Sequence, residues 1–143
     1  MKSKLLVFSQ FFLIFLMIIP FGQPVKFLSL GLSVSLLGIF VGVLALLKNR
    51  LGNFNIRPDL KVDGKLITTG VYRYIRHPMY SSVLLSMLGV VILYPMNYEY
   101  VLYGLLLLTL LIKLHYEEHL WRCETGEYRD YCSRTKKIIP FIY

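Results

Sequence analysis

Cysteine, tryptophan and acidic residues are scarce in this chain. Its 143 residues include two cysteines, one tryptophan and only 8 aspartates and glutamates, against 16 lysines and arginines. Cys123 and Cys132 are nine residues apart, so on one helix they would point to nearly opposite faces and could not form a disulfide within it. No CxxC pair or other cysteine–histidine metal spacing is present. We therefore expect two reduced thiols on the cytoplasmic side and no disulfide framework.

Charge is also scarce, and most of it is positive. Charged residues make up 17 % of the chain and apolar residues 56 %, whereas soluble domains have about a quarter charged and about half apolar residues. A net charge of +8 is compatible with binding to nucleic acid or to anionic lipid. Here the basic residues flank apolar blocks and form no stripe on a soluble fold. We expect an integral membrane protein with the bilayer as a partner and no nucleic-acid partner.

Four apolar blocks predict an all-α helical bundle with four transmembrane helices. The predicted spans cover about residues 5–21, 25–47, 79–94 and 98–114. The first block follows a basic start, as in a signal peptide, but no small-residue cleavage pattern follows it, so we expect it to remain as a helix. Gly38 and Gly42 in the second block would allow another helix to approach closely. The whole chain, residues 1–143, is expected to form one membrane domain.

The distribution of lysine and arginine predicts the orientation in the membrane. The chain start, a polar loop at 48–77 and the tail at 115–143 hold nearly all basic residues, whereas the two opposite turns hold only Lys26. The positive-inside rule then places both termini and the long loop in the cytoplasm, at the cell inner membrane. Gly126 is expected to end the last long helix. The tail beyond it, with Tyr128 and Tyr131, is expected to form an amphipathic C-terminal helix on the membrane surface.

Two polar clusters flank the last two predicted spans. The first ends in His77-Pro78, and the second contains Glu117 and Glu118. Because a short turn makes these spans antiparallel, the two clusters should meet at the cytoplasmic face. A proline-started helix offers free N–H groups that suit a carboxylate, and tyrosine faces can hold a sulfonium or ammonium cation. The arrangement indicates a ligand site.

Other interpretations of these residues stay open. Glu117 with Lys113, and Glu118 with Arg122, have the spacing of helical ion pairs, which would be purely structural. The same helix carries a His-x-x-Glu-His pattern, formed by His115, Glu118 and His119, that is typical of inverted zinc peptidases, although no third ligand is evident. A non-catalytic small membrane protein is a further alternative.

The residues of the two clusters carry a resemblance to a known family. Residues 66–80, the following apolar stretch and Glu117-Glu118 are similar to the isoprenylcysteine carboxyl methyltransferases and the related phospholipid N-methyltransferases. Spaced tyrosines and a final Ile-Pro complete the pattern, which covers about residue 53 to the C-terminus. Ser82, Trp121 and Thr125 stand where the family usually has Gly, Leu and Phe. These departures bear on the substrate more than on the cofactor.

The resemblance implies an enzyme, a membrane methyltransferase that uses S-adenosylmethionine. Its acceptor would be a lipidic or membrane-partitioned small molecule, with a carboxylate favoured and a phospholipid amine or a thiol as alternatives. The implied cofactor contacts are Leu66, Ile67, Thr68, Tyr72, His77, Pro78, Tyr80, Glu117 and Glu118. Lys113 and Arg76 are the implied catalytic residues, and Lys113 would orient the acceptor. No metal ligand is expected, and no oligomeric state is predicted.

Overall fold

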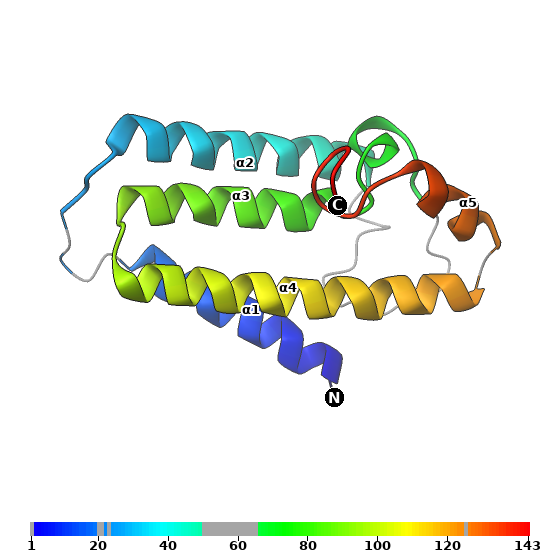
Figure 1. The fold of residues 1–143 in the computed structure, drawn as a ribbon, viewed down its shortest axis with the longest axis horizontal. Helices are drawn as coiled ribbons and strands as arrows, with labels where there is room; N and C mark the ends of the chain where they lie inside the picture. Colours follow the sequence, from blue (N-terminus) through cyan, green and yellow to red (C-terminus); the bar gives the residue numbers. More distant parts are fainter. Residues whose placement is uncertain (1, 20–21, 23, 50–65, 125) are drawn as a thin grey trace.

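Helices make up the regular structure of the described residues. The computed structural model describes residues 2–19, 22, 24–49, 66–124 and 126–143. The long helices lie side by side, and a short helix lies at one end (Figure 1). They are α1 (Lys2–Ile18), α2 (Leu28–Lys48), α3 (Pro78–Leu93), α4 (Asn97–Glu124) and α5 (Gly126–Arg134), with a 3-10 turn, η1 (Gly70–Arg73), before α3. The predicted all-α fold class is confirmed for this part of the chain.

A seam of small residues joins α2 and α3, the most closely packed pair of helices. A Cβ atom on Gly38 would lie 2.9 Å from the carbonyl oxygen of Ser82 and closer still to Ser86. The Ser82 hydroxyl donates a hydrogen bond to the Gly38 carbonyl oxygen at 2.8 Å. The Ser35 hydroxyl donates a hydrogen bond to the Ser86 carbonyl oxygen at 3.1 Å. The predicted close approach at Gly38 and Gly42 is therefore confirmed, and it fixes α3 against α2.

The apolar core lies between α1, α3 and α4. Leu106, Leu110 and Leu114 are fully buried and recur at one-turn spacing, so α4 presents one apolar stripe to its neighbours. The other buried members of this cluster are Leu13, Met17, Leu84, Val91 and Ile138. This core holds α1 and α3 in place along α4.

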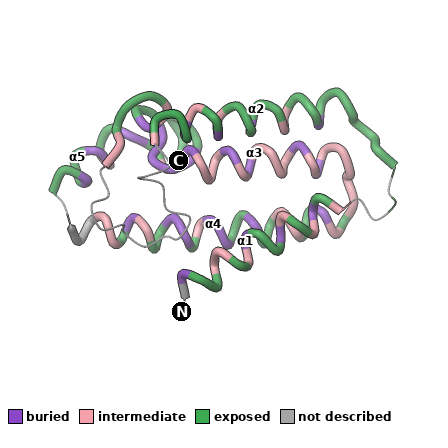
Figure 2. Tube along the Cα trace, turned by 180° about the vertical axis from the view of Figure 1, so that it is seen from behind, coloured by how far each residue is buried: buried purple, intermediate pink, exposed green. Residues whose placement is uncertain are grey.

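Exposed residues are frequent along α1, α2 and α4 (Figure 2), and many of them are large apolar residues. Phe8, Leu36, Phe40 and Leu108, for example, are each more than half exposed. Apolar surface of this extent marks contact with lipid or with a partner. Helix α2 and residues Asn97–Trp121 of α4 are long and apolar enough to cross a membrane, whereas α1 and α3 are shorter apolar helices. The described residues thus contain two candidate spans, and four spans remain a prediction.

The C-terminal region differs in part from the expectation. Helix α4 ends at Glu124, just before Gly126 as expected, and Gly126 itself begins a further helix, α5. Tyr128 and Tyr131 are 2 % and 5 % exposed, so they face the protein and not a membrane surface. The reason is how α5 packs: the Tyr131 hydroxyl donates to the Tyr72 carbonyl oxygen at 2.6 Å, and Tyr128 stacks on Trp121 with ring centroids 5.8 Å apart. Most of the predicted loop at 48–77 lies outside the described residues, and its end forms η1.

Candidate functional site

The two polar clusters meet at one end of the bundle. Pro78 is the first residue of α3 and is buried, a position where its missing N–H group costs nothing. A turn at residues 94–96 joins α3 to α4, so the two helices run antiparallel (Figure 1). The start of α3 therefore lies beside the last turns of α4. His77 comes to lie next to Glu117 and Glu118.

His77, Tyr80 and Glu117 contact one another, and we call them the His77–Tyr80–Glu117 group. The Tyr80 hydroxyl donates to Oε2 of Glu117 at 2.9 Å, and the same oxygen lies 3.7 Å from Nδ1 of His77. The rings of His77 and Tyr80 stack with their centroids 5.3 Å apart. The His77 side chain is buried, but 30 % of the Glu117 side chain is exposed. Glu117 is therefore the carboxylate that a ligand can reach.

Glu118 contacts Arg76 in addition to His77, whose Nε2 lies 3.4 Å from Oε1 of Glu118. The same Oε1 accepts a hydrogen bond from Nε of Arg76 at 2.7 Å, and the side chains of Glu118 and Arg76 are only 4 % and 6 % exposed. Nη1 of Arg76 donates to the carbonyl oxygens of Cys132 and Thr135 at the end of α5, where helical carbonyls lack partners within the helix. Burial lowers the pKa of Arg76, but the hydrogen bond and charge of Glu118 outweigh it and leave that pKa above its usual value.

The roles expected for Arg76 and Glu118 remain predictions. The sequence predicts a catalytic role for Arg76 and a cofactor contact for Glu118. In the structure both side chains are buried and bind each other. Arg76 also fastens α5 to α4. The alternative helical partner of Glu118, Arg122, has a side chain outside the described part of the chain.

Lys113 lies inside the bundle, one turn before Glu117, and is 1 % exposed. Its Nζ donates to Oε1 of Gln10 in α1 and lies 5.3 Å from the centroid of the Tyr80 ring. An ionisable side chain among apolar membrane helices is costly and usually marks function. Sequence reasoning missed Gln10, although a lone amide in the middle of the first apolar block was an available signal.

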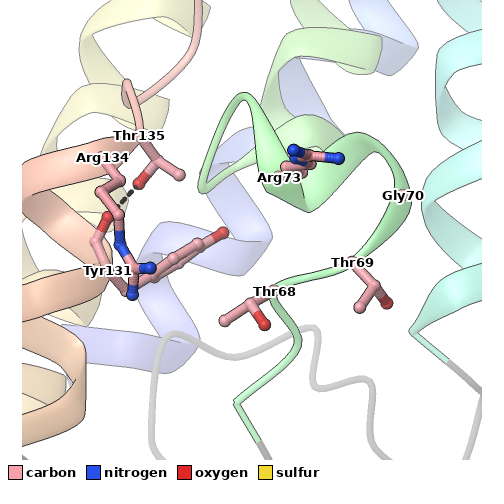
Figure 3. A pocket seen from close by; sticks show the side chains of 7 residues that line it. All are labelled: Thr68, Thr69, Gly70, Arg73, Tyr131, Arg134 and Thr135. Carbon is pink, nitrogen blue, oxygen red and sulfur yellow. Dashed lines mark hydrogen bonds between the residues drawn. The ribbon is translucent and has the colours of Figure 1, made fainter.

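The remaining predicted residues lie around η1 and a cavity next to it. Thr68 lines this cavity, which has a volume of about 630 Å³ and lies between η1 and the end of α5 (Figure 3). Leu66 and Ile67 are half-buried just before it, and Tyr72 is buried within η1. Burial raises the pKa of Tyr72, so its hydroxyl stays protonated at neutral pH. The predicted site residues thus gather at two places: the His77–Tyr80–Glu117 group with Lys113, and the region of η1.

The geometry gives no support to a zinc peptidase. No group of three or more potential metal ligands occurs among the residues that the structure describes. Nδ1 of His115 lies 2.7 Å from the Leu111 carbonyl oxygen, and Nε2 lies 3.3 Å from Nζ of Lys137. His115 and His119 are exposed, whereas Glu118 is buried against Arg76. The three residues of the pattern therefore face different surroundings.

Comparisons with known proteins confirm the family resemblance. The profile of a family described as phospholipid methyltransferase matches residues 27–123. Two rice proteins, from Oryza sativa subsp. indica and subsp. japonica, are each named probable protein-S-isoprenylcysteine O-methyltransferase and are 36 % identical to this chain over 89 residues. The alignment covers 61 % of this chain and 47 % of each relative, so the chain spans about half of their length. No solved structure matches the chain significantly.

Proposed function

Because the chain belongs to the phospholipid methyltransferase family, we propose that it transfers a methyl group from S-adenosylmethionine to a lipidic or membrane-partitioned acceptor. The observation that carries the proposal is the contact of His77 and Tyr80 with Glu117. These side chains come from two different helices, and a ligand at Glu117 would touch more than one of them. The names of the rice relatives favour transfer to oxygen. A phospholipid amine or a thiol is the alternative acceptor.

The polar groups around Glu117 and at the start of α3 fit the proposed cofactor. Bound there, S-adenosylmethionine would supply a methyl group from a sulfonium centre that is attached to a carboxylate, an amine and a ribose. The partly exposed carboxylate of Glu117 suits the amine or the ribose hydroxyls. The positive end of the α3 helix dipole, after His77 and Pro78, suits the carboxylate. The resemblance adds Tyr72 and residues 66–68 to the same site, and positioning alone can contribute roughly 7–11 kcal/mol to such a transfer.

Lys113 is the proposed acceptor-side residue. Its ammonium group lies under the Tyr80 ring and is held by Gln10. A cation in apolar surroundings attracts an anionic group strongly because the low dielectric does little to screen it. A carboxylate acceptor would be oriented there, and its negative charge would be stabilised until the methyl group arrives. Gln10 would set the position of the Lys113 side chain.

The direction of the helices favours four membrane spans. Contacts of Gly31 with Leu93 and of Gly42 with Ser82 make α2 and α3 antiparallel, and α3 is in turn antiparallel to α4 (Figure 1). Helices α2 and α4 therefore run in the same direction, and α3 must return the chain between them. At 1.5 Å per residue, α1 and α3 are about 25 Å long, close to the roughly 30 Å hydrocarbon core. We propose that both cross the membrane and that the site and both termini are cytoplasmic.

Cofactor binding tests the site directly. In purified protein in nanodiscs, His77→Ala and Glu117→Ala should each weaken S-adenosylmethionine binding by about tenfold or more, because hydrogen bonds to charged groups contribute roughly 1.5–3 kcal/mol. Isothermal titration calorimetry measures this affinity. His119→Ala is the matched control, since His119 is exposed on the same helix and lies outside the group. Unchanged affinity in both His77→Ala and Glu117→Ala would reject the site.

A transfer assay tests the reaction and identifies the acceptor. Native membranes containing the protein are incubated with S-adenosylmethionine labelled in the methyl group, and the labelled product is isolated. A methyl ester releases labelled methanol in base, whereas a methylated amine or thioether keeps its label. Cofactor binding without any labelled product would favour the non-catalytic alternative. Absence of binding as well would reject the methyltransferase.

A further inference from the structure

No member of the His77–Tyr80–Glu117 group lines the cavity between η1 and α5, although Thr68, one of the predicted cofactor contacts, does (Figure 3). Two segments far apart in the sequence, residues 68–73 and residues 131–135, form its wall. The wall is rich in hydrogen-bond donors and contains two arginines. The lining residues are Thr68, Thr69, Gly70, Arg73, Tyr131, Arg134 and Thr135.

Positive charge gathers around this cavity. Arg73 and Arg134 both line it, and among the described residues no acidic side chain does. The side chain of Lys48 passes close by, since its Cγ lies 2.7 Å from where a Cβ on Gly70 would be. Like charges around one hollow repel each other and disfavour the charged forms. An anion in the cavity would relieve this repulsion.

The two cavity arginines differ from Arg76, the buried arginine nearby. Arg76 is nearly inaccessible and paired with Glu118. Arg73 and Arg134 are exposed, and among the residues that the structure describes neither takes part in an ion pair. Nε of Arg134 donates to the Asp130 carbonyl oxygen at 3.3 Å, which leaves its two terminal amino groups as further donors.

We propose that this cavity binds a phosphate group, carried either by a lipid headgroup or by a small soluble molecule. Guanidinium forks match pairs of phosphate oxygens, and the hydroxyls of Thr68 and Thr69 add donors. With about 630 Å³, the cavity also has room for the group that carries the phosphate. Basic pockets on the cytoplasmic side of membrane helices are typical of lipid headgroup sites. The inference does not depend on methyl transfer.

Binding of two phosphate probes tests the proposal. The full chain is purified in dodecyl maltoside, which contains no phosphate, and is titrated with inorganic phosphate and with dihexanoyl phosphatidate. Dihexanoylglycerol is the uncharged control lipid. We expect at least one phosphate probe to bind, and Arg73→Gln and Arg134→Gln each to weaken it about tenfold or more. Tighter binding of the phosphatidate would identify a headgroup site, and equal binding of both probes would identify a site for soluble phosphates.

Arg129→Gln provides the matched control, because Arg129 is exposed on α5 but does not line the cavity. It should bind the probes as the unmodified protein does. Arg134→Lys keeps the positive charge but lacks the two-pronged guanidinium group, and this variant should bind the phosphate probes with intermediate affinity. All variants should unfold at the unmodified protein's temperature in the absence of probe, since the substituted side chains are exposed. The proposal is overturned if neither phosphate probe binds, or if Arg129→Gln loses as much affinity as Arg73→Gln and Arg134→Gln.

Discussion

Glu117 and Glu118 are neighbours in the chain, yet they meet different surroundings. Successive residues of a helix point about 100° apart, so one carboxylate reaches Tyr80 and the other reaches Arg76. Glu117 keeps 30 % of its side chain exposed, whereas Glu118 keeps 4 %. The pair therefore divides into one carboxylate open to a ligand and one that holds the fold.

Substitution of Glu118 tests whether this residue stabilises the fold. Glu118→Gln keeps the shape but leaves the buried Arg76 cation without its counter-charge, and loss of one partner of a buried pair costs about 3–5 kcal/mol. The unfolding temperature in detergent should fall clearly. Glu127→Gln, at an exposed position on α5, should leave it unchanged. Arg76→Met combined with Glu118→Met should destabilise less than Glu118→Gln, and normal stability of Glu118→Gln would contradict the structural role.

At this scale the sequence predicts local motifs better than distant pairs. The contact of His77 with Glu117 follows from a short hairpin between two helices, which turn residues and apolar lengths predict. The pairing of Arg76 with Glu118 depends on how α5 docks, and that of Lys113 with Gln10 depends on how α1 packs on α4. Neither docking leaves a periodic signal in the sequence. These pairs become visible only in three dimensions.

Among the elements, the seam between α2 and α3 supports the site. His77 immediately precedes α3, so a shift of α3 would move it. Gly38→Ala should push the two helices apart, because its Cβ would come within 2.9 Å of the Ser82 carbonyl oxygen, and overpacking costs roughly 1–3 kcal/mol. Gly104→Ala, in α4, has nothing within 4 Å and should be neutral or stabilising by up to about 1 kcal/mol. Thermal unfolding of the two variants measures the difference, and equal stability would argue against a tight seam.

Helix α1 contributes Gln10, whose Oε1 accepts a hydrogen bond from Nζ of Lys113. We predict that Gln10→Leu leaves the affinity for S-adenosylmethionine unchanged but lowers the rate of methyl transfer about tenfold or more, because Lys113 loses the group that positions it. Calorimetry and the labelled-methyl assay measure the two quantities. Ser33→Leu, at an exposed position on α2, is the control. A lowered unfolding temperature together with weakened cofactor binding would instead show that Gln10 serves the fold.

The arrangement of the whole bundle was only partly predictable. Apolar blocks and turn residues predict where the long helices lie, because both are local properties of the chain. The choice of packing partners is not local: the short turn suggests α3 against α4, whereas the closest packing is between α3 and α2. Small residues on both helices, such as Gly38 and Ser82, permit it. The inward-facing tyrosines of α5 depend likewise on neighbours that only the fold supplies.

Topology in the membrane is a property of the whole molecule. In a background with Cys123→Ser and Cys132→Ser, single cysteines are placed at Lys4, Asn97 or Ser133, all of which are exposed. With four spans, a membrane-impermeant maleimide should label Asn97→Cys in intact cells, and Lys4→Cys and Ser133→Cys only after the membrane is opened.

Alternative topologies give different labelling. If α1 stayed on the outer face, Lys4→Cys would react in intact cells together with Asn97→Cys. If α3 failed to cross, Asn97 would be cytoplasmic, and a crossing α4 would carry Ser133 to the outside. Labelling of Ser133→Cys in intact cells would therefore contradict four spans and a cytoplasmic site together, because Ser133 lies in α5, which Arg76 fastens to the same end of the bundle as His77 and Glu117.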